Sequence, residues 1–283
     1  MWEPRGHADM YGCLLMPPIT EEADLSVLFL HNEGFSTMCG NGIIALATVV
    51  LETGLHPRTG GETVLAIDTP AGLVRATAWS ERDRIDRVAF ENVPSFVLDL
   101  DGEVDVEALG HVRYDLAFGG AFYAFVDAPA LGLDLTPAHA SELIAAGRAV
   151  ASAVSEARAI EHPDSRDLGF LYGTILTGPA ADETRHSRHV CVFGDGEVDR
   201  SPTGTGVSAR LAILAARDEI GPGETIEIES IIGSCFTGRI LRRVTAGAYP
   251  AVVPEVGGRA FITGRHEFLL DPRDPWRDGF LIR

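Results

Sequence analysis

Residues 34–45 read Gly34-Phe35-Ser36-Thr37-Met38-Cys39-Gly40-Asn41-Gly42-Ile43-Ile44-Ala45, and this stretch decides the fold. The segment 42–52 that begins within it is apolar on nearly every side, which predicts a helix buried in the core rather than one with a polar face. Glycines flank Asn41, so backbone N–H groups there can approach a ligand closely. Because a helix N-terminus favours negative charge, we expect an anion to bind beside Cys39 and its thiol to be partly ionised.

The same pattern recurs far downstream, at Ser201-Pro202-Thr203-Gly204-Thr205-Gly206-Val207-Ser208-Ala209. These residues match 37–45 in type at most positions and again lead into an apolar helix. Two copies of one strand–loop–helix pattern indicate two similar halves. If the two loops face each other, both helix N-termini point at one small anion, and Cys39 lies across the site from Thr203.

The rest of the chain alternates short apolar runs with turn residues, which predicts a strand-rich α+β protein. Strands are expected at 13–16, 25–31, 64–67, 73–79, 87–90, 112–117, 122–126, 169–176, 189–193, 225–230, 238–245 and 259–263, and a further helix at 136–158. Residues 92–95 are expected to cross between the halves, and the apolar end 280–282 to dock on the first half. We therefore expect one domain of residues 1–95 plus 266–283 and a second of residues 96–265.

Composition restricts the class of partner. The chain has 283 residues and a formal net charge of -18, which argues against nucleic acid and anionic membrane surfaces. No apolar run approaches the roughly 20 residues that cross a bilayer, and residues 1–7 do not resemble a signal peptide. The four cysteines show neither metal-ligand spacing nor a disulfide framework, so we expect a cytoplasmic protein without a metal site. Cys13, Cys191 and Cys235 lie in apolar stretches and are expected to fill core space.

Five motifs together resemble the proline racemase family, and they cover essentially the whole chain. They are Glu3-Pro4-Arg5-Gly6-His7, Met38-Cys39-Gly40, Asp68-Thr69-Pro70-Ala71-Gly72, Gly120-Ala121-Phe122-Tyr123-Ala124, and Asp199-Arg200-Ser201-Pro202-Thr203-Gly204-Thr205-Gly206. The resemblance implies a diaminopimelate-epimerase-like fold: two similar domains, each a curled, mostly antiparallel sheet around a central helix, with the active site between them. It also implies a small imino-acid substrate, no cofactor and a homodimeric assembly.

The second loop departs from the family's isomerases, which carry a cysteine in both loops. One cysteine removes the α-proton and the other reprotonates the opposite face, but here the second position is Thr203. A threonine hydroxyl is too weak an acid or base for that step near neutral pH. The pair Cys39 and Thr203 instead resembles the family's dehydratases of trans-3-hydroxy-L-proline, which form pyrroline-2-carboxylate. This resemblance makes Cys39 the base at Cα and gives Thr203 a hydrogen bond to the substrate or to its leaving hydroxyl.

The remaining predicted site residues serve substrate binding. Backbone N–H groups near Gly40, Asn41, Gly204 and Thr205 can stabilise charge that builds on the carboxylate. Asp199 stands in the family's amine-facing position and is expected to be the counter-ion of the ring nitrogen. His7 and Asp9 fit the mouth of the site and a structural turn equally well.

Two departures from the family keep alternatives open. Asn41 stands where most members have histidine, which is expected to affect substrate preference. The family's leading strand–loop–helix segment does not precede residues 3–7, which is expected to leave a sheet edge open. The alternatives are a 4-hydroxyproline epimerase or proline-racemase-like isomerase, and a truncated relative that binds imino acids without turnover. Both glycine loops also match the G-x-G-x-x-A dinucleotide fingerprint, but the expected antiparallel strands disfavour that interpretation.

Overall fold

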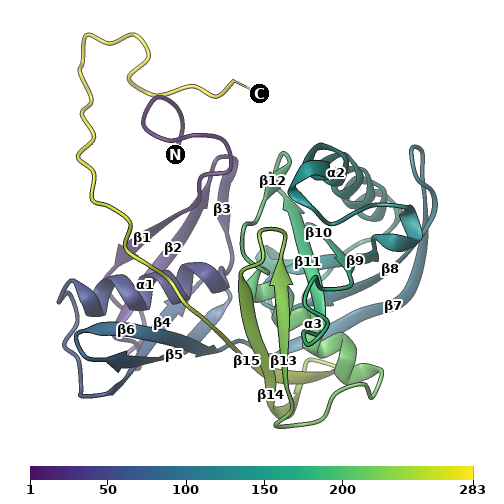
Figure 1. Cartoon of the computed structure of the whole chain (residues 1–283), viewed down its shortest axis with the longest axis horizontal. Helices are drawn as coiled ribbons and strands as arrows, with labels where there is room; N and C mark the ends of the chain where they lie inside the picture. Colours follow the sequence, from purple (N-terminus) through teal and green to yellow (C-terminus); the bar gives the residue numbers. More distant parts are fainter. Residues whose placement is uncertain (283) are drawn as a thin grey trace.

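The computed structural model describes residues 1–282 and has two lobes that lie side by side (Figure 1). The first lobe comprises β1 (Gly12–Met16), β2 (Leu25–His31), β3 (Gly34–Ser36), α1 (Gly40–Glu52), β4 (Glu62–Thr69), β5 (Gly72–Glu81) and β6 (Arg84–Glu91). The second comprises β7 (Ser95–Val106), β8 (Gly110–Phe118), β9 (Phe122–Asp127), α2 (Ala140–Ala157), β10 (Leu171–Gly178), β11 (Ser187–Phe193), β12 (Glu197–Val198), α3 (Gly204–Ala216), β13 (Thr225–Ser230), β14 (Cys235–Ala246) and β15 (Tyr249–Gly258). Short 3-10 turns lie at Pro129–Leu131, Pro137–His139 and Arg166–Leu168.

One hydrogen-bonded sheet runs through both lobes, and β15 joins them. Residues 255–258 of β15 pair with β6, whereas residues 251–252 pair with β7. In the second lobe β7, β8, β9, β10, β11, β13, β14 and β15 pair in that order, and β15 returns to β7, so eight strands close a ring. The order β1-β2-β4-β5-β6 in the first lobe places β1 at an edge of the sheet. The strands of the second lobe therefore form a closed ring, whereas those of the first lobe form an open sheet, and the two are continuous through β15.

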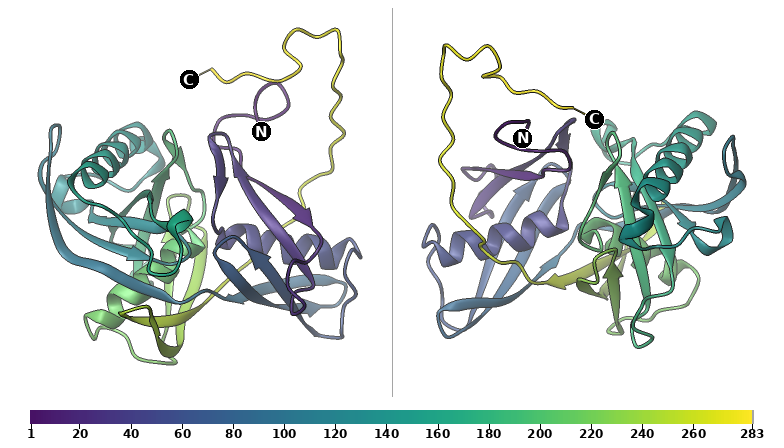
Figure 2. Two further views of the ribbon diagram at one scale, coloured as in Figure 1. Left: turned by 180° about the vertical axis from the view of Figure 1, so that it is seen from behind. Right: turned by 45° about the horizontal axis from the view of Figure 1, so that its top comes forward.

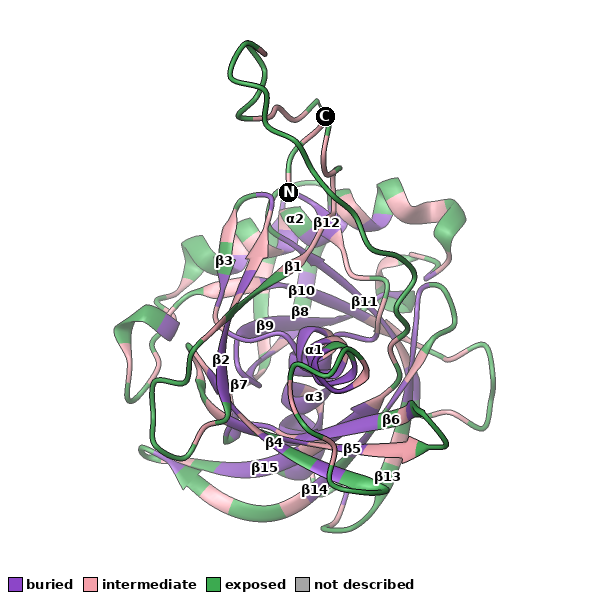
Figure 3. Cartoon of the chain, turned by 90° about the vertical axis from the view of Figure 1, so that its left-hand side faces the viewer, coloured by how far each residue is buried: buried purple, intermediate pink, exposed green. Residues whose placement is uncertain are grey.

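Each lobe packs its strands against a helix that begins at a glycine loop. Figure 3 looks along these helices, with α1 and α3 at the centre and strands around them. In α3 every residue from Gly204 to Ala215 is buried except Arg210. Ile213 packs in a cluster with residues of β8 to β11, while Leu211 packs with residues of β14 and β15. A helix surrounded on all sides needs no polar face, which explains its apolar sequence.

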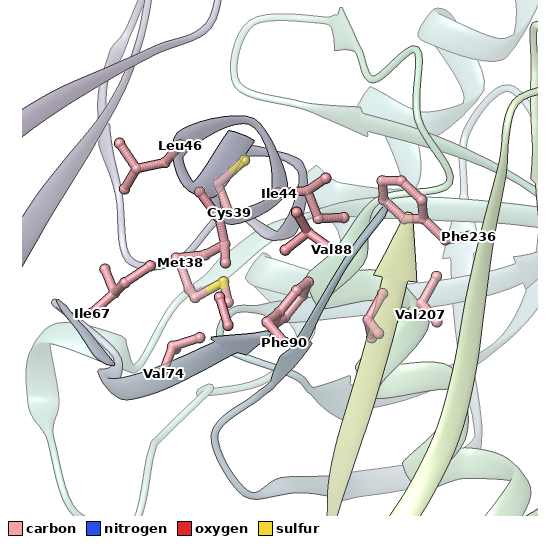
Figure 4. Packing of buried hydrophobic residues seen from close by; sticks show 14 of the residues in the cluster. Met38, Cys39, Ile44, Leu46, Ile67, Val74, Val88, Phe90, Val207 and Phe236 are labelled. Atoms are coloured by element: carbon pink, nitrogen blue, oxygen red, sulfur yellow. The ribbon is translucent and has the colours of Figure 1, made fainter. Parts of the chain in front are cut away.

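Apolar packing also crosses between the lobes beside the helix N-termini. Ile44 and Phe90 of the first lobe and Val207 and Phe236 of the second belong to one buried cluster (Figure 4). Burial of apolar surface contributes roughly 25 cal/mol per Å². This cluster therefore fixes how the two helix N-termini sit relative to one another.

The N-termini of α1 and α3 meet at two glycines. A Cβ atom on Gly40 would lie 2.5 Å from the Cα of Gly204, and one on Gly204 would lie 2.6 Å from the Cα of Gly40. The ring of Phe90 closes the same space, 2.9 Å from a Cβ on Gly40. No side chain fits at this contact, so the glycines are required by close approach of the two backbones.

Most predicted elements are confirmed, including the crossing at 92–95, and most strand pairs are antiparallel. The parallel pairs are β2–β4, β9–β10 and β11–β13. The strand predicted at 259–263 is wrong, because β15 ends at Gly258 and the chain beyond it has no regular structure. Strand β15 escaped prediction because Pro250 and Pro254 are atypical of a strand interior. Strand β7 escaped because its register shifts between Asp99 and Gly102 interrupt the alternation of apolar residues.

The C-terminal segment runs past the first lobe and ends beside the N-terminus (Figure 2). Glu3 and Phe280 exchange backbone hydrogen bonds of 2.9 and 3.0 Å. Phe280 of the predicted apolar end therefore pairs with the start of the first half, whereas Ile282 is 76% exposed and does not dock.

We predict that Gly40→Ala destabilises the protein by about 1–3 kcal/mol, because the added methyl group must push Gly204 and Phe90 apart. The measurement is the free energy of unfolding from urea titration. Gly61→Ala is the matched control, since a Cβ there meets no atom within 4 Å. Equal stability of the two variants would contradict the close contact.

Candidate active site

A cavity of about 290 Å³ lies where the N-termini of α1 and α3 meet. The structure brings all seven predicted site residues into its lining: Cys39, Gly40, Asn41, Asp199, Thr203, Gly204 and Thr205. Asp9, Tyr11, Met38, Tyr123, Tyr172, Cys191, Phe193, Val198, Arg200 and Ser201 complete the wall. The two glycine loops therefore do face each other across one site, as the repeat predicted.

Cys39 is the N-cap residue of α1 and lies in apolar surroundings (Figure 4). Its sulfur accepts a 3.3 Å hydrogen bond from the Gly42 N–H. Burial raises the pKa of the Cys39 thiol well above its usual range, and Cys13 and Asp199 add to this, while the Gly42 N–H and the Tyr11 hydroxyl oppose it. The expectation of a partly ionised thiol is therefore wrong, because desolvation outweighs the helix terminus.

Thr203 lies at the equivalent position before α3, but its side chain does not cap the helix. Its hydroxyl donates a 2.9 Å hydrogen bond to Asp199 Oδ2 instead. The backbone of Thr203 has φ 66°, a conformation that costs a β-branched residue about 1–3 kcal/mol. The surrounding contacts thus hold Thr203 in a strained position at the cavity wall.

The Asp199 carboxylate is the centre of a polar network that joins the two loops. Oδ1 accepts hydrogen bonds from the Ser201 N–H at 2.8 Å and from Asn41 Nδ2 at 3.2 Å. Asn41 Oδ1 accepts in turn from the Ser201 hydroxyl at 3.0 Å. Burial raises the pKa of Asp199 even though these donors, with Thr203, act to lower it. Among the residues that the structure describes, the hydrogen-bond donors to this carboxylate are neutral groups.

Both helix N-termini present uncompensated positive ends to the cavity. Neither α1 nor α3 has an acidic residue in its first turn. Gly40, Asn41, Gly204 and Thr205 line the wall at these ends. Unpaired N–H groups and the helix dipoles favour a bound anion here, such as a carboxylate.

Sequence reasoning missed an aromatic wall. The rings of Tyr172 and Phe193 stack at 5.4 Å, Tyr11 meets Phe193 edge-on at 6.2 Å, and Tyr123 meets Tyr172 at 5.7 Å. The Tyr123 hydroxyl is hydrogen-bonded to Thr205 Oγ1 at 2.7 Å. Apart from the motif around Tyr123, no local signal separates these residues from ordinary inward-facing aromatic residues of a core.

Of the two residues predicted for the mouth of the site, one lines the cavity. Arg200 donates to the Asp9 carbonyl at 3.3 Å and to its carboxylate at 3.4 Å. Asp9 therefore lines the mouth, as one of the two alternatives predicted, whereas His7 does not.

The expectation that the other cysteines fill the core holds for Cys191, which is buried and also lines the cavity. It is wrong for Cys13, which is exposed because β1 is an edge strand, and Cys235 is only half-buried.

Within residues 1–282, no group of three histidine, cysteine or acidic side chains is placed to hold a metal ion. In the same part of the chain, no helix combines the length and apolar character needed to cross a membrane.

The raised pKa of Cys39 gives a direct prediction. The thiolate absorbance at 240 nm that is lost in Cys39→Ser should be absent at about pH 8.5, the ordinary thiol pKa, and appear only at more alkaline pH. The measurement is the difference titration of the two proteins. A midpoint at or below the ordinary value would show that burial does not control this sulfur.

Comparison with known proteins places this geometry in a family. Residues 1–281 match the family model described as proline racemase. A trans-3-hydroxy-L-proline dehydratase of Colwellia psychrerythraea is 44% identical over 283 residues, covering 100% of this chain and 80% of the relative. A 3-hydroxyproline 2-epimerase of Burkholderia multivorans is also 44% identical over 283 residues, covering 100% of this chain and 84% of the relative.

Solved structures agree with the fold. The crystal structure of a hydroxyproline epimerase from Agrobacterium vitis, with bound trans-4-hydroxy-L-proline, has a TM-score of 0.95 and 36% identity, covering 100% of this chain and 81% of that one. A predicted epimerase of Pseudomonas aeruginosa has a TM-score of 0.59 at 14% identity, covering 92% of this chain and 84% of that one, which shows a shared fold. The chain belongs to the proline racemase family.

Proposed function

We propose that this protein catalyses the dehydration of trans-3-hydroxy-L-proline to pyrroline-2-carboxylate. The observation that carries the proposal is the pairing of one cysteine, Cys39, with Thr203 at two helix N-termini that share a cavity. Relatives at 44% identity that carry the name trans-3-hydroxy-L-proline dehydratase support it. An isomerase that uses two bases needs a second acid or base at position 203, which threonine does not supply.

The zwitterionic substrate matches the charges of the cavity wall. Its carboxylate binds at the N-termini of α1 and α3, where the N–H groups near Gly40 and Gly204 stabilise charge as the α-proton leaves. Its cationic ring nitrogen lies against Asp199, whose carboxylate accepts hydrogen bonds from the neutral Ser201 N–H and Thr203 hydroxyl. A cation beside Asp199 also favours ionisation of Cys39, so substrate binding itself lowers the thiol pKa.

The stereochemistry of the substrate explains why one base suffices. In trans-3-hydroxy-L-proline the hydroxyl and the carboxylate lie on opposite faces of the ring, so the Cα–H and C3–O bonds lie on the same face. Cys39 takes the α-proton on that face, and the hydroxyl departs from it. Thr203 lies at the opposite loop with its proton directed to Asp199, so it cannot reprotonate Cα. The enamine product then becomes the pyrroline in water.

The proposal extends to the domains of the chain, its cellular compartment, its assembly and its cofactor requirement. We assign residues 1–95 with 266–283 to one domain and 96–265 to the other, each a curled sheet around α1 or α3, with the active site between them. The contacts of α1 with β5 and β6, and of α3 with β7, β8, β14 and β15 of the closed ring, support this division, and one apolar cluster joins the two domains. Four unpaired cysteines favour a reducing cytoplasm. We propose a homodimer that needs no cofactor.

The deciding experiment is incubation of the protein with trans-3-hydroxy-L-proline and detection of pyrroline-2-carboxylate with o-aminobenzaldehyde. Inversion at C2 of a hydroxyproline without pyrroline formation would favour the epimerase alternative. The name of the Burkholderia multivorans relative, 3-hydroxyproline 2-epimerase, motivates this alternative. A rise in Tm with pyrrole-2-carboxylate but no turnover of any hydroxyproline would favour a binding protein.

Substitutions at the two loops should separate the roles of their residues. Cys39→Ser should lower kcat by about 10³-fold or more, because a serine hydroxyl is a far weaker base than a thiolate. Thr203→Ala should lower kcat/KM by about ten-fold, because Asp199 loses one hydrogen bond of about 1.4 kcal/mol. Cys235→Ser on β14, outside the cavity, is the control and should retain full activity. Unchanged turnover in Cys39→Ser would remove this mechanism.

A further inference from the structure

The dehydration proposed above needs a donor for the oxygen that leaves C3. Among the predicted residues only the Cys39 thiol lies on that face, and it carries a proton only after it has taken the one from Cα, so a donor that is already protonated must be a further residue. The single hydroxyl proton of Thr203 is directed to Asp199 Oδ2 at 2.9 Å. Asn41 and the Ser201 N–H also direct their protons to this carboxylate. The departing oxygen lies on the face attended by Cys39, so the donor must come from the wall on that side.

Tyr11 lies on that side. It precedes β1, lines the same cavity as Cys39, and its hydroxyl is hydrogen-bonded to the Ser36 hydroxyl at the end of β3. Its ring is stacked at 6.2 Å on His31 and meets Phe193 edge-on at 6.2 Å. The ring is therefore held between the two lobes with its hydroxyl fixed, as a catalytic donor requires.

The Tyr11 hydroxyl also interacts with the sulfur of Cys39 and with Tyr172. Burial raises the pKa of Tyr11 far above its usual range, and Cys39 and Tyr172 add to this. The phenol therefore stays protonated at neutral pH and can donate a hydrogen bond. The hydrogen bond with the Ser36 hydroxyl orients it.

Resting on the proposed function, we propose that Tyr11 is a further catalytic residue, whose hydroxyl gives its proton to the C3 oxygen as the C3–O bond breaks. Cys39 first takes the α-proton, and the electron pair of the Cα–H bond forms the Cα=C3 double bond. The electron pair of the C3–O bond stays on the oxygen, which accepts the Tyr11 proton and leaves as water. The Tyr11 oxygen then takes the proton held by Cys39, which restores the thiolate and the neutral phenol.

The other hydroxyl and cationic groups of the wall are less suited to this step. The Tyr123 hydroxyl is hydrogen-bonded to Thr205 Oγ1 at the loop opposite Cys39. Arg200 directs its N–H groups to Asp9 at the mouth. Tyr172 interacts with the Tyr11 hydroxyl and so supports it.

The test compares two leaving groups in the full-length protein. The variant Tyr11→Phe keeps the ring and removes the donor, and its kcat/KM is measured with trans-3-hydroxy-L-proline and with trans-3-fluoro-L-proline. Both substrates lose the same α-proton and give the same pyrroline, but fluoride leaves without needing a proton. We expect Tyr11→Phe to lower kcat/KM by about 10²-fold on the hydroxyl substrate and by less than about three-fold on the fluoride.

Two outcomes would overturn the proposal. An equal loss on both substrates would mean that Tyr11 serves proton removal by Cys39, and no loss on either would mean that it is a structural aromatic residue. Wild-type protein that turns over neither substrate would remove the proposed function itself, which is a different result from an active wild type with an unaffected variant.

Two further variants exclude a general effect of losing a buried hydroxyl. Tyr114→Phe on β8 removes a phenol that does not line the cavity and should leave both rates unchanged. Ser36→Ala removes the hydrogen-bond partner of Tyr11 and should lower the hydroxyl rate by about three- to ten-fold while sparing the fluoride rate. Urea titration of each variant checks that it is folded under the assay conditions.

Discussion

The contact between Gly40 and Gly204 sets the position of everything else in the site. It brings two helix N-termini together with no side chain between them and no acidic residue in either first turn. Each terminus carries a partial positive charge, so two facing termini repel one another. An anion placed beside them relieves that repulsion. The apolar cluster around Phe90 and Phe236 holds the lobes together against the repulsion between the two termini. The bound anion then adds the negative charge that these termini favour.

The acidic groups of the site, Asp199 and Cys39, likewise favour a ligand of opposite charge. Burial raises the pKa of both Asp199 and Cys39, and the neutral donors around Asp199 only partly oppose this. Both groups are costly to ionise until a cation arrives. A zwitterion with its carboxylate and ammonium on neighbouring atoms compensates both ends of the site at once. This accounts for a cavity that is poorly solvated yet suited to a small, fully charged imino acid.

The loops and the two buried helices could be predicted because the residues that determine them are neighbours in the sequence. Gly40, Gly42, Gly204 and Gly206 indicate the starts of the helices, and the apolar runs that follow indicate that the helices are buried. The ionisation of Cys39 could not, because it depends on burial by residues distant in sequence. The aromatic wall could not be recognised for a related reason, since Tyr172 looks like any inward-facing strand residue until the ring of strands closes. Closure itself depends on β15, a strand with two prolines.

Thr203 shows how one position can select between two outcomes of the same first step. Removal of the α-proton leaves a planar carbanion that can be reprotonated on the far face or can expel a group from C3. A thiol at position 203 would supply the far-face proton, but a thiol is a weak hydrogen-bond donor and would support Asp199 poorly. The threonine hydroxyl does the reverse: it directs its proton to Asp199, in a backbone conformation with φ 66° that the network sustains. In the mechanism that we propose, the far face lacks an acid, so the carbanion reacts on the near face, where Tyr11 donates to the C3 oxygen.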